Sequence, residues 1–222
     1  MSAVLKILRR DLIRAARSGG SWAYGLVFMA IFLALCGIAL DGEMSVLRRL
    51  GVPLIWLAIT FAALMSVDHV FADDLRDGTT GQLWLSGVSY MTQAVAALLS
   101  FCIVYLLPLI ITVPLWSLLF DLSAPTVAGL LLALLCALPG LAAFTALAGA
   151  LTGARGKGGF LAIFISAPLL VPILIFGVAA TQSYQSLGLA AVEFRGLIGL
   201  SLLALALSIP ASAAALSVNT DR

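Results

Sequence analysis

Charged residues are scarce in this chain. It has 12 Lys and Arg and 10 Asp and Glu among 222 residues, so only 10% is charged, against about 25% in an ordinary soluble domain. Hydrophobic residues make up 63%, and the mean hydropathy is +1.17. A soluble fold could not bury so much apolar surface, and about 20 helical residues are enough to cross a bilayer. Residues 1–222 are therefore expected to form one all-α integral membrane domain, with no room for a separate soluble one.

The chain has a single histidine and no closely spaced cysteines. Cys36, Cys102 and Cys136 lie far apart inside apolar windows, with no C-x-x-C and no nearby histidine to complete a metal or covalent haem site. They are interpreted as small, polarizable core residues. The single histidine, in Asp68-His69, is interpreted as part of a polar span terminus, with a proton relay or haem ligand as alternatives. No metal site and no directly bound cofactor are expected.

Complete signatures for nucleotide binding or metal-dependent catalysis are missing as well. The stretch GARGKGG at 153–159 contains Gly156-Lys157, but a phosphate-binding loop needs Ser or Thr where this chain has Gly158. The stretch DGTTGQ at 77–82 begins like the D-G-x-x-A-R signature of CDP-alcohol phosphotransferases, yet the Ala, the Arg and the later aspartates are absent. We therefore expect a non-enzymatic chain without its own ATPase, and no nucleic-acid partner.

Six apolar runs are long enough to cross a bilayer. Pro108 and Pro114 are expected to kink or loosen the outer half of the third. The polar segment 180–196 is too short to cross and is expected to form a surface or re-entrant helix. The expected spans cover approximately residues 22–40, 52–70, 90–116, 126–151, 160–179 and 197–216.

Residues 2–18 show an amphipathic helical pattern. Val4, Leu5, Leu8 and Leu12 fall on one stripe. Such a helix suits the headgroup layer, with its basic side toward anionic lipid, as an elbow before the first span. The alternative is a basic flank without defined structure. The basic residues of this elbow are Lys6, Arg9, Arg10, Arg14 and Arg17.

The distribution of positive charge predicts the orientation. With the N-terminus inside, nine of the twelve Lys and Arg lie in cytoplasmic segments, and only Arg48, Arg49 and Arg195 lie outside. Six spans with both termini in the cytoplasm satisfy this distribution.

The stretch from Phe71 to Ser89 is the one sizeable polar segment in the middle of the chain. Asp73, Asp74, Arg76 and Asp77 fall within five positions, between two expected spans. Asp77-Gly78 predicts a turn, after which Thr79 or Thr80 could cap a new helix. That helix would carry Leu83, Trp84 and Leu85, an apolar face too short to be buried alone. The segment therefore resembles a docking element for a partner.

Three stretches of the chain form a set of motifs. They are FADDxxDGT at 71–79 with QL at 82–83 and LS at 85–86, RxKGGFL at 155–161 with APLxxPILIFG at 167–177, and PAxAAAL at 210–216. With these motifs the chain resembles the CcmB family, the permease subunits of an ABC-type complex in bacterial cytochrome c maturation. The resemblance extends over the whole chain in length, span number and motif order, whereas the basic elbow and six spans alone would fit any ABC-2-type permease. One departure is Gly81, where the family usually has an acidic residue.

The resemblance implies a half-transporter in the bacterial inner membrane that pairs with the cytoplasmic ATPase CcmA and works beside CcmC, CcmD and the haem chaperone CcmE. ATP would be bound by the partner, and haem would be handled by the complex. The segment between spans two and three would be a coupling helix, with the ATPase contact formed by Asp73, Asp74, Arg76, Asp77, Gly78, Leu83 and Trp84. An ABC-2-type permease for another cargo, and a membrane docking subunit without transport, remain as alternatives.

Overall fold

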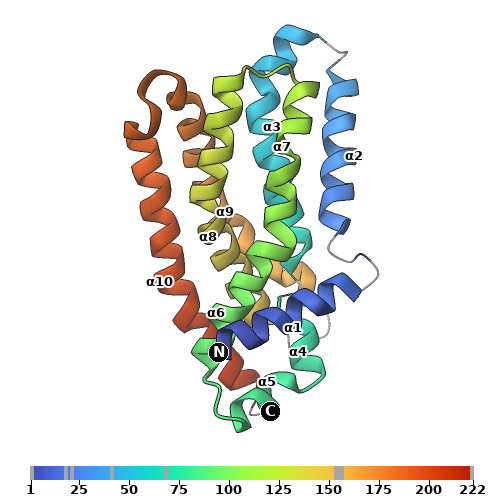
Figure 1. Ribbon diagram of the computed structural model, residues 1–222, viewed down its shortest axis with the longest axis vertical. Coiled ribbons are helices and arrows are strands. Elements are labelled where there is room, and N and C mark those ends of the chain that lie inside the picture. The colour runs from blue at the N-terminus through green and yellow to red at the C-terminus, as the bar shows by residue number, and fades with distance from the viewer. Residues whose placement is uncertain are drawn as a thin grey trace.

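The computed structural model describes residues 3–17, 20, 23–40, 43–67, 70–152 and 158–220, the side chains of 158–163 excepted. These residues form helices and short connections, and no strand occurs among them. Long helices run side by side, while α1 (Ala3–Arg17), α4 (Ala72–Arg76) and α5 (Thr79–Leu85) gather at one end, together with both ends of the chain (Figure 1). We call this the terminal end and the opposite one the far end.

Five of the expected membrane spans correspond to helices that are long and apolar enough to cross a bilayer. The helix of the third span consists of α6 (Tyr90–Phe101), a π-helical turn and α7 (Leu107–Leu119). The chain is thus a multi-pass membrane protein. The other four helices are α3 (Met44–Met65), α8 (Ala124–Thr152), α9 (Gly158–Leu187) and α10 (Val192–Thr220).

The first expected span corresponds to α2 (Ala23–Ala39), an apolar helix of 17 residues beside α3 (Figure 1). It would extend about 25 Å, somewhat less than a hydrocarbon core of about 30 Å. A sixth span therefore stays a prediction.

The proline-dependent irregularity expected in the third span occurs immediately before Pro108. Residues Cys102–Leu106 are π-helical, and the backbone N–H of Leu107 donates to the carbonyl of Cys102, five residues back. Pro108 has no N–H to continue the α-helical pattern, so the ladder adjusts at this position. Pro108 falls in the first turn of α7 and Pro114 farther along it, and the helix stays α-helical past Pro114 to Leu119.

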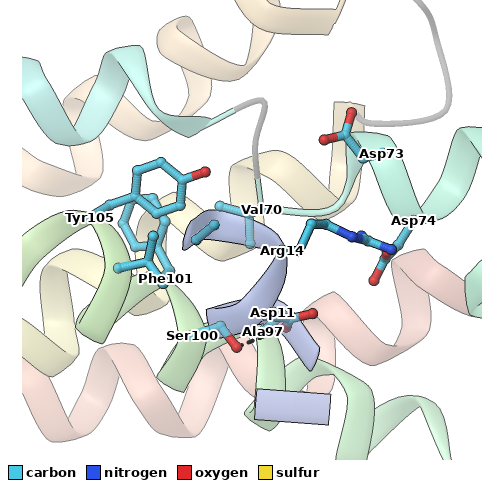
Figure 2. A pocket seen from close by; sticks show the side chains of 11 residues that line it. Asp11, Arg14, Val70, Asp73, Asp74, Ala97, Ser100, Phe101 and Tyr105 are labelled. Carbon is cyan, nitrogen blue, oxygen red and sulfur yellow. Dashed lines mark hydrogen bonds and ion pairs between the residues drawn. The ribbon is translucent and has the colours of Figure 1, made fainter. Parts of the chain in front are cut away.

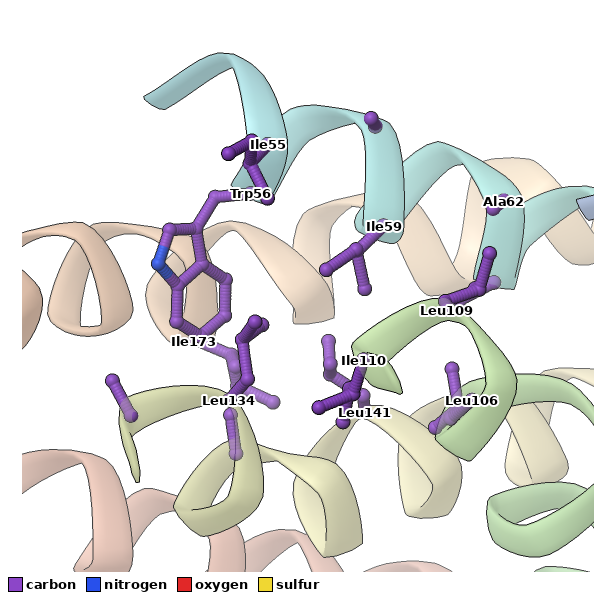
Figure 3. Packing of buried hydrophobic residues seen from close by; sticks show 14 of the residues in the cluster. Ile55, Trp56, Ile59, Ala62, Leu106, Leu109, Ile110, Leu134, Leu141 and Ile173 are labelled. Atoms are coloured by element: carbon purple, nitrogen blue, oxygen red, sulfur yellow. The ribbon is translucent and has the colours of Figure 1, made fainter. Parts of the chain in front are cut away.

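The core forms where α3, α7, α8 and α9 meet. Trp56 of α3 is fully buried, and its indole N–H donates to the Thr181 hydroxyl at 3.2 Å. Ile59, Ile110 and Leu134 pack close to it from three helices (Figure 3). The bulky indole fits because position 177 is glycine, where an added Cβ would lie 2.4 Å from the Trp56 ring.

The expectation for residues 180–196 is wrong. These residues do not form a separate surface or re-entrant helix. α9 continues to Leu187, a single 3₁₀ turn covers Gly188–Ala190, and α10 begins at Val192. The first turn beyond residue 179 packs on neighbouring helices, since Thr181 is buried and accepts from the Trp56 indole of α3 and Tyr184 lies against Gly129 of α8. Gln182, Gln185 and Ser186 are exposed and still helical.

Candidate functional site

The polar segment between α3 and α6 folds into two short helices at the terminal end. α4 and α5 are joined at Asp77 and Gly78, and Gly78 takes a left-handed φ of +68°. Glycine adopts this conformation without the steric cost of a Cβ. The turn predicted from Asp77-Gly78 is therefore confirmed.

The two ends of α5 are stabilised differently. Neither Thr79 nor Thr80 caps the helix as expected: Gly78 occupies the N-cap position without a side-chain hydrogen bond, Thr79 is already helical, and Thr80 is buried. At the other end the N–H of Gly87 donates to the Trp84 carbonyl at 2.9 Å and that of Val88 to the Leu83 carbonyl at 3.0 Å. This paired arrangement, with glycine in a left-handed conformation, satisfies the last carbonyls of the helix.

One face of α5 is attached to the membrane helices. The buried Gln93 amide of α6 donates to the backbone carbonyls of Thr80 and Val88, at 3.3 and 3.1 Å. Gly81 faces α10, since an added Cβ would lie 3.1 Å from the Thr220 side chain. The position at which this chain departs from the family pattern thus lies against its own last helix.

Asp74 joins α4 to α1. Its carboxylate accepts from Arg10 at 2.6 Å and from Arg14 at 2.7 Å (Figure 2 shows Arg14 and Asp74). Burial opposes the charge on the Arg10 guanidinium, but the nearby Asp74 and Asp11 carboxylates outweigh burial and raise its pKa. Arg10 is therefore held as a cation between two acidic groups.

Asp11 extends this network into the membrane helices. Its carboxylate accepts from the Ser100 hydroxyl of α6 at 2.8 Å and also pairs with Arg10. A cavity of about 100 Å³ lies between α1, α4 and α6, lined by acidic groups on one side and by apolar residues such as Val70 and Phe101 on the other (Figure 2). Through Asp11 and Asp74, α1 contacts both the polar segment and the third span. We call Asp11, Arg10, Arg14, Asp74 and Ser100 the α1 network.

The remaining expected partner-contact residues are solvent-facing, with one exception. Asp73, Arg76, Asp77 and Gly78 are exposed, whereas Leu83 is half-buried. Trp84 is 49% exposed and stacks on Tyr90 with ring centroids 4.6 Å apart, and the neighbouring Leu85 is 86% exposed. The segment thus has an attached side and an open side that carries both apolar and acidic groups.

The basic residues of the predicted elbow fall into two groups. Arg10 and Arg14 bind Asp74, whereas Lys6, Arg9 and Arg17 are exposed and have no ion pair within the described part of the chain. The buried apolar residue of α1 is Ile7, while Leu5 and Leu12 of the predicted stripe are 47% and 37% exposed.

Three important polar residues were not among the expected site residues: Asp11, Gln93 and Ser100. The sequence contains a pattern that could have identified each of them. Asp11 is the one acidic residue in a basic helix, and Gln93 and Ser100 are seven residues apart in an otherwise apolar span, which puts them on the same helical face. Asp68, His69, the basic turn at 153–157 and Arg222 lie outside the described residues, so the interpretations given to them stay predictions.

The described residues contain no group of three or more His, Cys, Asp or Glu side chains arranged to hold a metal ion. At the terminal end, the polar segment contacts α1 through Asp74, α6 through Gln93 and α10 at Gly81.

Comparison with known proteins identifies close sequence relatives along the whole chain. A family model described as CcmB protein matches residues 2–219. A protein named heme exporter protein B from Bradyrhizobium diazoefficiens is 33% identical over 226 residues, which cover 100% of both chains. Proteins of the same name are 34% identical in Rhodobacter capsulatus, over 96% of this chain and 98% of theirs, and 34% in Pseudomonas aeruginosa, over 96% of each.

Proposed function

The chain belongs to the CcmB family, and on that premise we propose that it is the membrane permease subunit of an ABC-type complex in c-type cytochrome biogenesis. Its relatives are named heme exporter protein B, and its own structure is a bundle of apolar helices with a polar segment at one end. Haem is accordingly the cargo or ligand that the complex handles. The subunit itself is not an enzyme, and ATP is bound and hydrolysed by a partner chain.

The observation that carries this proposal is the two-sided polar segment α4–α5. On its attached side, Gln93, Asp74 and Gly81 connect it to α6, α1 and α10. On its open side, Asp77 and Trp84 are available to a partner. A displacement of this segment by a partner would therefore move three other helices, as a coupling helix must.

We assign the ATPase role to CcmA, whose nucleotide-dependent closure would bias the bundle between two states. CcmC, CcmD and the haem chaperone CcmE complete the proposed complex, and ATP hydrolysis would drive release of haem-loaded CcmE. The terminal end faces the cytoplasm of a bacterium in this proposal, because most Lys and Arg residues belong to that side. α1 would lie along the inner membrane surface.

Two other functions differ from this proposal in testable ways. An ABC-2-type permease for another cargo would use the same ATPase contact without a haem-handling partner. A docking subunit without transport would also need the open side of α5, but it would work equally well with an ATPase that cannot hydrolyse ATP.

Charge reversal on the open side of the segment tests the coupling assignment. In the double variant Asp73→Lys with Asp77→Lys, both altered side chains are exposed, so membrane insertion and yield should stay unchanged. Recovery of the ATPase from detergent-solubilised membranes should fall several-fold. The matched control is Glu43→Lys with Glu193→Lys, which makes the same charge change at the far end and should leave recovery unaltered.

The same pull-down separates the alternatives. ATPase recovery at the wild-type level with the Asp73 and Asp77 variant would contradict the coupling assignment. Recovery of an ATPase without any haem-handling membrane protein would favour another cargo. Undiminished release of the haem chaperone in the presence of a hydrolysis-deficient ATPase would favour the docking subunit.

A further inference from the structure

The far end of the bundle contains a polar hollow of about 600 Å³ that the proposed coupling function does not use. It lies between the first turns of α3, the turn that joins α7 to α8, and the last turns of α9. Arg48 and Arg49 line it from α3, Asp121 from the turn, and Gln182 and Gln185 from α9. Val52 and Leu122 add apolar surface, so the hollow presents charged and amide groups beside an apolar wall.

Among the described residues of the far end, Arg49 and Arg195 have no ion pair, and of these two Arg49 lines the hollow. Arg48 donates to the Asp121 carboxylate, and the distance from its Nε to the carboxylate oxygen is 2.9 Å. Arg195 donates to the Ala190 backbone carbonyl at 3.2 Å. Arg49 lines the hollow and has no ion pair among the described residues. Two arginines and one aspartate give the hollow a net charge of one positive. An unpaired arginine is notable here because the outer ends of membrane proteins are poor in Lys and Arg.

Close packing holds the wall of this hollow in place. Gly51 lets the turn approach α3, since an added Cβ would lie 2.7 Å from the Phe120 side chain. The approach brings Asp121, which has a left-handed φ of +48°, into reach of Arg48. With Arg48 neutralised by this contact, Arg49 is left to provide the charge for a ligand.

The hollow is also rich in hydrogen-bond donors. The Gln185 amide donates to the Thr126 hydroxyl at 2.5 Å, and Gln182 is exposed beside it. A planar guanidinium with carboxamides nearby matches an oxyanion, because it can donate two parallel N–H bonds to neighbouring oxygens.

The position of Arg49 indicates which oxyanion is available. α3 has 22 residues and spans about 33 Å, roughly the thickness of the hydrocarbon core. Arg49 lies five residues after Met44, about 7.5 Å along the helix axis, and its long side chain can extend back to the headgroup layer. The anions concentrated at that depth are the phosphates of phospholipids.

We propose that the far-end hollow is a binding site for a phosphate group, provided by an anionic phospholipid of the adjoining leaflet or by a soluble phosphate, with Arg49 as its charged ligand. Arg48 and Asp121 form the wall that positions it, and Gln182 contributes a neutral donor.

Native mass spectrometry of the full chain in detergent, with phosphatidylglycerol or phosphatidylcholine added, tests this site. The wild type should retain phosphatidylglycerol preferentially. Arg49→Gln should reduce that preference about tenfold, the effect of losing one charge-assisted contact. The matched control Arg195→Gln removes the same charge from the same end, outside the hollow, and should retain the preference. Arg49→Lys keeps the charge but loses the paired N–H donors, so it should restore part of the preference, which a purely structural role for Arg49 would not explain.

A second measurement distinguishes the source of the phosphate. Thermal stabilisation of the lipid-free protein by inorganic phosphate that depends on Arg49, without a preference for phosphatidylglycerol, would assign the site to a soluble anion. Absence of both effects in the wild type, equal losses in the Arg49→Gln and Arg195→Gln variants, or an Arg49→Lys variant that binds no better than Arg49→Gln would overturn the proposal. The assay needs no ATPase, so its outcome is independent of the coupling function.

Discussion

Replacing Asp74 with asparagine removes the charge that Arg10 and Arg14 share while preserving the shape of the side chain. Exposed ion pairs contribute about 0.2–1 kcal/mol, and breaking a buried pair costs about 3–5 kcal/mol. Here the side chains of Asp74, Arg10 and Arg14 are 20%, 29% and 46% exposed, so the free energy of the two pairs should lie between these two ranges. We expect the variant to lose about 1–2 kcal/mol of the free energy that holds α1 against α4, equivalent to roughly a 5- to 30-fold change in local opening.

Amide hydrogen exchange of the peptide covering Ala3–Arg17 measures this opening directly. Exchange of α1 should accelerate by that factor in Asp74→Asn, whereas amides in α8, remote from the network, should keep their wild-type rates. α1 should not detach completely, because Asp11 still accepts from Ser100 and Ile7 stays buried against the bundle.

The adjacent Asp73→Asn variant is the control, because Asp73 is exposed and forms no ion pair within the described chain. Its α1 exchange should equal that of the wild type. Unchanged exchange in Asp74→Asn, or equal acceleration in both variants, would refute the conclusion that Asp74 holds α1 in place.

Two further substitutions test how the bundle is packed. Gln93→Leu should remove the side-chain donor from the Thr80 carbonyl of α5 and from the Val88 carbonyl that follows the helix, destabilise α5 by about 1–3 kcal/mol and increase proteolysis in the 79–88 region, with the midpoint of global unfolding nearly unchanged. Gly177→Ala should place a Cβ 2.4 Å from the Trp56 ring and lower the thermal unfolding midpoint by several degrees. The control is Gly199→Ala, which has no atom within 4 Å of the new Cβ and should leave the midpoint unchanged. Equal midpoints for the two variants would count against the packing described for α9.

Hydropathy and length determined the membrane helices almost without reference to tertiary structure. Apolar runs of the right length predicted the helices of five spans, because a lipid environment leaves the backbone few alternatives to helix formation. The Asp77-Gly78 turn and the irregularity near Pro108 were predictable for local reasons: glycine tolerates a left-handed φ, and proline lacks an N–H.

Polar residues near the ends of helices were predicted less well. The segment 180–196 is too polar for hydropathy to predict that a span continues into it, yet α9 stays helical to Leu187, and its buried Thr181 accepts from Trp56, 125 residues away. Hydropathy averages over neighbours in sequence and therefore cannot register a partner on another helix.

The sequence by itself determined that this chain is a helical membrane protein of the CcmB family type, with a polar segment in its middle. Only the tertiary structure decided which charges of that segment are used internally. Asp73 and Asp74 are adjacent and chemically identical, yet the helical turn of α4 directs Asp74 to Arg10 and Arg14 and leaves Asp73 exposed. The choice between them depends on where α1 crosses the bundle, a contact over 64 residues of chain that no local pattern encodes.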